Sequence, residues 1–425
     1  MPLRTNVKTS IRESPISGGL REPYRTPAVL KFPDDKVPGY GPLKVGVERQ
    51  LKPQRPFPQD LVNTAANDLK DLVLTKARPV VAFPKSKRTV SQAVLGLPGT
   101  LFCESLKLNT SPGWPLCSQV PGKNKSHFVN IDEERENCLL TGKLLELYNV
   151  NHNLRKEGTV PFSVYADFGK DERLKAGKGM RLINGSPFDH TIEWRRYCMD
   201  FFAAFQNAGL DVGSAIGINT QGTGFDQIGK RLLSVSDKIL AGDYSNFGPT
   251  IQSEFIYAIS SIVRAWYAEF VPNQHPTDDL IRRILFEELA HCKHIAGDCI
   301  YETFCGSPSG NPYTAPINTL ANLLYLRVAW LLIFKGTSLC DMSAFNKYFV
   351  AFCYGDDFIG SINVNLCKIF NNKSIQKCFS EFGIIYTDAL KTKDTIAYQK
   401  LEECSFLKCS FVRHESRDLW LAGLD

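Results

Sequence analysis

Two short apolar segments flank a pair of adjacent carboxylates in the last quarter of the chain. Residues 348–353 and 358–364 are rich in aromatic and β-branched side chains, which predicts two strands. The Tyr-Gly-Asp-Asp sequence at 354–357 lies between them as a tight hairpin turn, and its glycine permits the turn's backbone. Two like charges beside buried strands are costly unless a cation neutralises them. The pattern therefore indicates a metal site at Asp356 and Asp357, although a solvated turn explains the same residues taken alone.

A third apolar segment, at 239–244, predicts a strand that ends at Asp243 and precedes a helix from about 251 to 270. A carboxylate at the end of a strand is a usual position for a metal ligand, and a helix cap is the alternative. If this strand and the hairpin belong to one sheet, Asp243, Asp356 and Asp357 converge.

Helical periodicity predicts further helices at about 58–74, 131–148 and 191–207. The most apolar stretch, 319–334, is too short for a membrane span and is interrupted by Asn322 and Arg327. We therefore expect a buried core helix there and no transmembrane segment.

Polar residues precede and begin this apolar helix. Ser309, Gly310, Thr314 and Asn318 place hydroxyl and amide groups near its N-terminus, with Thr314 and Asn318 on one face. Such a face suits a sugar hydroxyl or a phosphate. An ordinary helix start with incidental polar residues remains the alternative.

The most basic segment contains five cations in twelve residues, with Gly177 and Gly179 among them. The cations are Lys170, Arg173, Lys175, Lys178 and Arg181. A hairpin that directs them inward would bind a triphosphate or an RNA backbone, whereas a solvated charged face explains them equally well. A turn-rich loop at 109–115 could similarly bring Thr110, Ser111, Gly113 and Trp114 against a nucleic-acid strand.

Composition narrows these choices only a little. The chain has 425 residues, 43% hydrophobic and 22% charged, as expected for two or three subdomains, and its net charge of +6 permits a polyanionic partner. The 13 cysteines form no C-x-x-C pair, which fits free thiols in a reducing compartment. Zinc at residues 291–305 is disfavoured, because Gly297-Asp298 predicts a hairpin turn between the candidate ligands.

These motifs occur together and in one order from about Thr26 to Phe411. In this respect the chain resembles the RNA-dependent RNA polymerases of picorna-like positive-strand RNA viruses, most of all those of insect iflaviruses. The resemblance is carried by Asp243 in the first metal-binding strand, Gly355-Asp-Asp357 in the catalytic hairpin, and Ser309-Gly310 with Thr314 and Asn318 in the S-G-x3-T-x3-N helix. It extends to the basic segment 170–183, the template-entry loop 110–115, the palm motif 382–391 and the primer-grip hairpin Phe406-Leu-Lys408.

The resemblance implies an α+β right-hand polymerase fold, with an antiparallel palm sheet backed by helices. It places fingers at 1–190, the first part of the palm at 191–252, a fingers insertion at 253–304 and the second part of the palm at 305–400. Residues 401–425 would form the primer-grip hairpin and a thumb stub. Because relatives continue with a helical thumb, we expect this chain to lack most of the thumb and to be weakly active or inactive.

The resemblance also implies two-metal catalysis, with Mg2+, or Mn2+ in its place, held by Asp243, Asp356 and Asp357. Lys391 would protonate the pyrophosphate, with Lys393 as the competing candidate. Lys170, Arg173, Lys178, Arg181, Ser309, Thr314 and Asn318 would bind the nucleotide, and Thr110, Ser111, Gly113, Lys175, Gly310 and Lys408 would bind RNA. The implied partners are an RNA template and primer, rNTPs, a viral protein primer and other replication proteins, at membrane-associated replication complexes in the host cytoplasm.

One position departs from the family pattern. Many relatives carry a second aspartate five residues after the first, which senses the ribose 2′-hydroxyl, and this chain has Gly248 there. We therefore expect Asn318 and Ser309, with Asn246, to discriminate against deoxyribose. A catalytically silent RNA-binding or assembly module stays open as an alternative. A reverse transcriptase also has paired aspartates at a hairpin, but the Ser309 to Asn318 pattern and the basic segment disfavour it.

Overall fold

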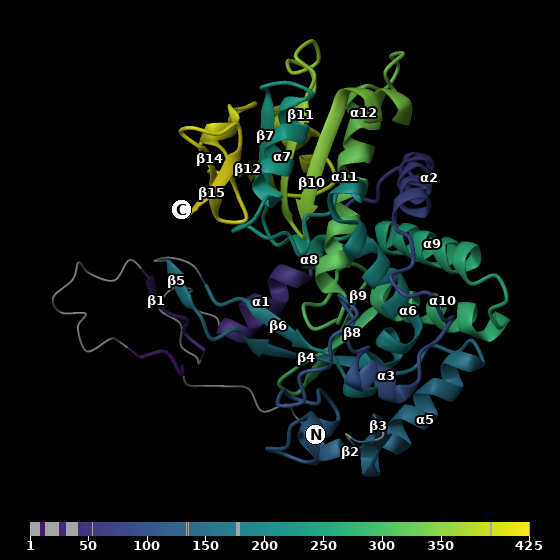
Figure 1. The fold of residues 1–425 in the computed structure, drawn as a ribbon. Helices are drawn as coiled ribbons and strands as arrows, with labels where there is room; N and C mark the ends of the chain where they lie inside the picture. Colours follow the sequence, from purple (N-terminus) through teal and green to yellow (C-terminus); the bar gives the residue numbers. More distant parts are fainter. Residues whose placement is uncertain are drawn as a thin grey trace.

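The computed structural model describes residues 9–12, 25–30, 41–52, 54–132, 134, 136–175, 179–391 and 393–424 (Figure 1). Its helices are α1 (Pro42–Gln50), α2 (Gln59–Lys76), α3 (Val90–Leu95), α4 (Leu116–Gln119), α5 (Gly142–Lys156), α6 (Phe188–Ala208), α7 (Gly224–Leu233), α8 (Phe247–Thr250), α9 (Ser253–Phe270), α10 (Pro276–Ala290), α11 (Thr314–Ile333), α12 (Met342–Tyr348) and α13 (Asn372–Ser380). Its strands are β1 (Arg25–Pro27), β2 (Val129–Asp132), β3 (Asn137–Leu140), β4 (Val164–Gly169), β5 (Arg173–Lys175), β6 (Leu182–Gly185), β7 (Ile239–Tyr244), β8 (Cys292–Ala296), β9 (Cys299–Thr303), β10 (Phe349–Tyr354), β11 (Asp357–Ile362), β12 (Tyr386–Asp388), β13 (Ser405–Phe406), β14 (Cys409–Arg413) and β15 (Trp420–Leu424).

A four-stranded antiparallel sheet in the order β10-β11-β7-β12 occupies the upper part of Figure 1. Its strands are almost continuously buried, because α11 and α13 pack against it. Gly242 in β7 permits the closest packing, since a Cβ there would lie 2.2 Å from the Tyr386 hydroxyl and 2.4 Å from the Phe358 ring. The sheet thus brings the 239–244 and 349–362 segments side by side, as the sequence predicts.

A second four-stranded sheet, in the order β6-β4-β8-β9, lies below the first in Figure 1. It joins two parts of the chain that are far apart in sequence, since β4 pairs in parallel with β8 while the other pairs are antiparallel. The β8–β9 hairpin confirms the turn predicted at Gly297-Asp298.

Helix α11 is the central core helix. It is long and apolar enough to span a membrane, with a mean hydropathy of 1.3, but 83% of its apolar window is buried in the protein. Arg327, which interrupts the apolar run, is buried against α2 and binds the Asp68 carboxylate at 2.7 Å. Packing therefore accounts for the helix, as the sequence predicts, but the prediction that the stretch is too short for a membrane span is wrong, because α11 has 20 residues.

The helix predicted at 131–148 is wrong over its first half. Residues 129–132 and 137–140 pair as the β2–β3 hairpin, and α5 begins only at Gly142. Burial alternates along β3, where Cys138 and Leu140 are buried and Leu139 is exposed. Over so short a segment, alternation and helical periodicity are hard to distinguish.

Candidate active site

The β10–β11 hairpin has Gly355 and Asp356 as its two-residue turn and Asp357 as the first residue of β11. Tyr354 pairs with Asp357 at its base, and Gly355 adopts a φ of +61°, which favours glycine. Two side chains of α11 hold the turn from below. Thr319 Oγ1 accepts a hydrogen bond from the Gly355 amide at 2.8 Å, and Asn322 Nδ2 lies 3.0 and 3.1 Å from the Gly355 and Asp356 carbonyl oxygens.

Asn322 is itself oriented by the hydroxyl of Tyr244, the residue after Asp243, which donates to Asn322 Oδ1 at 3.0 Å. Thr319 and Asn322 are fully buried. Sequence reasoning treated Asn322 only as an interruption of an apolar helix and missed Thr319. The available signal was two polar residues three positions apart within that apolar run, because buried polar groups need partners.

Asp243 lies next to the hairpin because β7 pairs with β11. The register places Phe358 opposite Gly242, so Asp357 and Asp243 are the next residues along the two strands. Burial, with the charges of Asp356 and Asp243, raises the pKa of Asp357 to about 6. Partial desolvation and the Asp243 charge also raise the pKa of Asp356, although the Asp356 side chain is exposed. We call these three residues the carboxylate site.

The carboxylate site is an oxygen donor set of the kind that Mg2+ and Mn2+ prefer. Burial, and after it repulsion between neighbouring carboxylates, raises the pKa of Asp356 and Asp357, and a divalent cation would relieve that repulsion. Within the described part of the chain, no three acidic, His or Cys side chains are already closed around one point. The predicted ligands are therefore neighbours on two strands whose side chains would have to turn toward a bound ion.

Lys391 lies beside the carboxylate site. Its ammonium binds the Asp243 carboxylate at 2.7 Å, and 64% of its side chain is exposed. Its positive charge lowers the pKa of both Asp356 and Asp357, against the stronger effect of burial. Lys408, at the tip of the β13–β14 hairpin, acts on Asp357 in the same direction. The two predicted lysines thus approach the carboxylate site from different segments.

The basic segment, which lies much earlier in the chain than the hairpin, also comes near the carboxylate site. Arg181 binds both carboxylate oxygens of Glu172, and Lys170 lies 3.7 Å from the same carboxylate. This pairing raises the pKa of the Arg181 guanidinium, and Asp356 contributes to the shift. Arg173 is exposed in β5, which also contains Lys175, whereas Lys178 lies outside the described residues. At least two of the predicted cations, Arg181 and Lys170, therefore lie against the Glu172 carboxylate. The sequence pattern did not reveal this pairing.

The Ser309 loop, residues 306–311, leads into α11 and lies on β6. The Ser309 hydroxyl accepts a hydrogen bond from the Asn184 amide at 2.9 Å. Gly310 is required by packing, because a Cβ there would lie 1.9 Å from the Asn184 carbonyl oxygen. Thr314 Oγ1 lies 2.8 and 2.9 Å from the Asn311 and Pro308 carbonyl oxygens. The Thr314 hydroxyl therefore stabilises the start of α11 in this structure.

Asn318 faces Gly248. A Cβ at Gly248 would lie 3.8 Å from Asn318 Nδ2, and Asn318 Oδ1 is buried without a hydrogen-bond partner in the protein. A buried amide oxygen without a partner is costly, so this atom is available to a ligand hydroxyl. Asn246, by contrast, donates to the Arg49 carbonyl oxygen at 2.9 Å, which favours a structural role.

The predicted template-entry loop is held against the protein. Gly113 has a φ of +73°, and a Cβ there would lie 2.3 Å from the Ser186 carbonyl oxygen. The Ser111 hydroxyl accepts from the Gly113 amide, and the Thr110 hydroxyl accepts from Lys125. Trp114, predicted to contact nucleic acid, packs on a buried apolar cluster that includes Val164 and Ala166.

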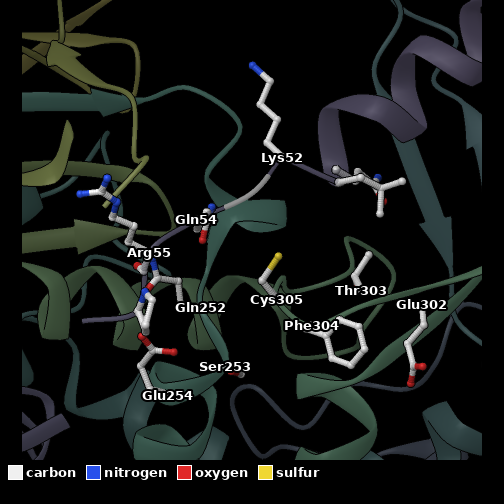
Figure 2. A pocket seen from close by; sticks show the side chains of 13 residues that line it. Lys52, Gln54, Arg55, Gln252, Ser253, Glu254, Glu302, Thr303, Phe304 and Cys305 are labelled. Atoms are coloured by element: carbon white, nitrogen blue, oxygen red, sulfur yellow. The ribbon is translucent and has the colours of Figure 1, made fainter. Parts of the chain in front are cut away.

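A cavity of about 310 Å³ lies behind these loops, between the chain after α1, the start of α9 and the end of β9. Figure 2 shows Gln54, Gln252, Cys305 and Phe304 around it. None of the candidate catalytic residues lines this cavity. The disfavoured zinc ligands nearby have other partners, since His294 binds Asp167.

Comparison with known proteins assigns the family. Residues 27–424 match the family model of the viral RNA-dependent RNA polymerases, and the chain belongs to this family. The chain is 30% identical to the genome polyprotein of Deformed wing virus over 443 residues, which cover 99% of the chain and 15% of the polyprotein. It is also 30% identical to the genome polyprotein of Ectropis obliqua picorna-like virus, over 98% of the chain and 13% of that polyprotein. The chain therefore spans a small part of these relatives.

The fold comparison agrees with this assignment. The Sicinivirus 3Dpol RNA dependent RNA polymerase superposes with a TM-score of 0.78 at 21% identity, over 100% of this chain and 83% of that one. The predicted resemblance to picorna-like viral polymerases and the predicted α+β right-hand fold are thus confirmed. The domain boundaries and the roles of individual site residues stay predictions.

Proposed function

We propose that this chain catalyses template-directed RNA synthesis in viral genome replication, by transferring a nucleotidyl group from an rNTP to an RNA 3′-hydroxyl. The supporting observation is the convergence of Asp243, Asp356 and Asp357 from two paired strands, with raised pKa values at the hairpin. Repulsion between neighbouring carboxylates, seen as raised pKa values, is typical of a site that binds a cation.

Asp243 and Asp356, supported by Asp357, would hold two Mg2+ or Mn2+ ions. Such ions lower the pKa of the primer 3′-hydroxyl and stabilise charge on the α-phosphate and the leaving pyrophosphate. In the reaction the 3′-oxygen bonds to the α-phosphorus, the bond to the β-phosphate oxygen breaks, and the hydroxyl proton is lost. Arg181 and Lys170 would neutralise the triphosphate after exchanging Glu172 for it.

Lys391 would donate the proton to the pyrophosphate. In this structure its ammonium is bound to Asp243, so it must be released when a cation binds that carboxylate. Asn318 Oδ1, buried and without a partner, would accept the ribose 2′-hydroxyl beside Gly248. We further propose that the chain binds an RNA template and primer. It would also work with a protein primer in a membrane-associated replication complex.

Primer extension with the intact chain and Mg2+ tests this proposal. We expect weak but measurable rNTP incorporation by the wild type and none by Asp356→Ala. Asp237→Ala is a matched control, because Asp237 is an exposed carboxylate just before β7 that pairs with its neighbour Lys238. Equal extension by wild type and Asp356→Ala, or no extension with either Mg2+ or Mn2+, would contradict the proposal. Preferential use of dNTPs would instead support a reverse transcriptase.

A further inference from the structure

A row of buried polar side chains crosses the sheet β6-β4-β8-β9. Asn184 on β6 is directly opposite Asp167 on β4, and Asn184 Nδ2 donates to Asp167 Oδ1 at 2.7 Å. His294 Nδ1 lies 3.1 Å from the same oxygen, and the Tyr301 hydroxyl donates to the other oxygen. Asp167 is fully buried, and Asn184 and His294 are 5% and 3% exposed. Three donors thus converge on one carboxylate.

This carboxylate fixes the orientation of the Asn184 amide. Since an ionised carboxylate only accepts hydrogen bonds, the NH2 group of Asn184 must face Asp167, and its oxygen must face away. That oxygen lies 3.2 Å from the Ser309 amide nitrogen, while the Asn184 backbone amide donates to the Ser309 hydroxyl at 2.9 Å. The row therefore ends in a two-point attachment of the Ser309 loop.

The attachment joins two parts of the proposed nucleotide site. Strand β6 begins directly after Arg181, and the Ser309 loop runs into α11, which carries Asn318. Close packing of Gly310 on the Asn184 carbonyl leaves the loop little freedom while both hydrogen bonds hold. Loss of the attachment would let the loop move away from β6, and the position of Ser309 would be less well defined.

We propose that Asn184 is a positioning residue for sugar selection, which joins Asp167 to the Ser309 loop and holds that loop where a ribose is preferred over a deoxyribose. This inference rests on the proposed function, and it assigns the selectivity partly to a residue that does not touch the nucleotide. Selectivity is sensitive to small displacements of the groups that contact the sugar.

Two substitutions weaken the attachment in different ways. Asn184→Ala removes the side-chain bonds to Asp167 and Ser309 and leaves the bond from the Asn184 backbone amide to the Ser309 hydroxyl. Asn184→Asp leaves the acceptor for Ser309 but places two carboxylates opposite each other. For each we expect the ratio of kcat/KM for an rNTP to that for the matching dNTP to fall about 10-fold, through a higher rNTP KM and faster dNTP incorporation. Asn184→Asp combined with Asp167→Asn exchanges donor and acceptor across the same pair, and it should recover part of the ratio, because the new NH2 group at 167 also faces His294 Nδ1.

Asn151→Ala is the matched control. Asn151 donates to the buried Asp189 carboxylate at 2.8 Å, but it joins α5 to α6 and not β6 to the Ser309 loop. We expect this variant to lose comparable stability and to keep the wild-type ratio. An equal fall of the ratio in both variants, or an unchanged ratio in Asn184→Ala, would overturn the inference.

Hydrogen exchange of the peptide that contains 307–311 gives a readout that needs no catalysis. We expect faster exchange in Asn184→Ala than in wild type or Asn151→Ala, because the Ser309 amide loses its acceptor. Unchanged exchange would overturn the attachment even in an active enzyme. A chain that incorporates no nucleotide but shows the faster exchange would refute the proposed function and retain the attachment.

Discussion

Carboxylates at two places in this molecule have pKa values shifted in opposite directions. In the carboxylate site, burial and mutual repulsion raise the pKa of Asp357 to about 6. At Glu288 on α10, burial acts in the same direction, but the Arg155 guanidinium and His190 outweigh it and hold the pKa well below its usual range. Arg155 binds both oxygens of Glu288 at 2.8 and 2.9 Å. The pKa shifts differ in direction because the partners differ, since burial raises the pKa at both places.

The contrast indicates which carboxylates serve the fold and which serve a ligand. Glu288 ties α10 to α5 and α6, and each of its oxygens has a donor. The charges of Asp356 and Asp243 instead raise the pKa of Asp357, and the turn is held through its backbone by Thr319 and Asn322. The hairpin is thus rigid while its charges stay available. Substitutions in the two groups should therefore have opposite signatures.

The largest effect is expected for Asp243→Asn. Removing this carboxylate should lower the rate of nucleotide incorporation by about 1,000-fold, in line with the loss of a metal ligand. Its folding stability should change by less than about 1 kcal/mol, because among the described residues the ion pair lost is that with Lys391, whose side chain is mostly exposed. Single-turnover incorporation and thermal unfolding measure the two quantities. A strongly destabilised variant would place Asp243 with the structural carboxylates.

Glu288→Gln should behave in the reverse manner. Breaking a buried ion pair leaves Arg155 without its counter-charge, which typically costs about 3–5 kcal/mol of stability. Glu287→Gln, at the exposed neighbouring position, should cost less than about 1 kcal/mol. Denaturant unfolding of the two variants gives the comparison. If the folded fraction of Glu288→Gln showed altered sugar selectivity, the separation between the two groups would fail.

How much of this contrast is visible in the sequence depends on the range of the interactions. The strands beside Asp243 and the Asp356 hairpin follow from local apolar patterns, and the family motifs place their order. The support from Thr319 and Asn322 and the attachment of Ser309 to Asn184 depend on hydrogen bonds between distant segments, which spacing does not specify. The pairing of Arg181 with Glu172 spans only nine residues, but the charge pattern alone does not specify which cation binds that carboxylate. The β2–β3 hairpin was missed because a short alternating segment also fits a helix.

Asn318→Ala tests a smaller effect within the nucleotide site. Because Asn318 Oδ1 has no partner in the protein, its removal should change stability by less than about 1 kcal/mol. The preference for rNTP over dNTP should fall about 10-fold. Asn322→Ala, four residues further along α11, is the matched control. It loses the bonds that hold the hairpin, so we expect about 1–3 kcal/mol of destabilisation and lower incorporation of both sugars.

The smallest effect is a stabilisation by Asp357→Asn in the absence of divalent cations. A folded-state pKa of about 6, above the ordinary value of 3.8, means that the folded protein holds this proton more tightly than the unfolded chain. The wild type therefore loses stability as pH rises from about 4 to 6, whereas the amide does not titrate. Above pH 6 we expect Asp357→Asn to be more stable by about 1–2 kcal/mol, after allowance for solvent screening, and equal near pH 4.

Added Mg2+ should narrow this stability gap above pH 6, because the wild type binds the cation more tightly than the variant does. Thermal unfolding at pH 4 and 7.5, with and without Mg2+, measures all four conditions. Asp298→Asn, at the exposed turn between β8 and β9, is the matched control. If the wild type were more stable than Asp357→Asn at pH 7.5 without Mg2+, the ionised Asp357 carboxylate would be stabilised by the fold, and the expected repulsion would be contradicted.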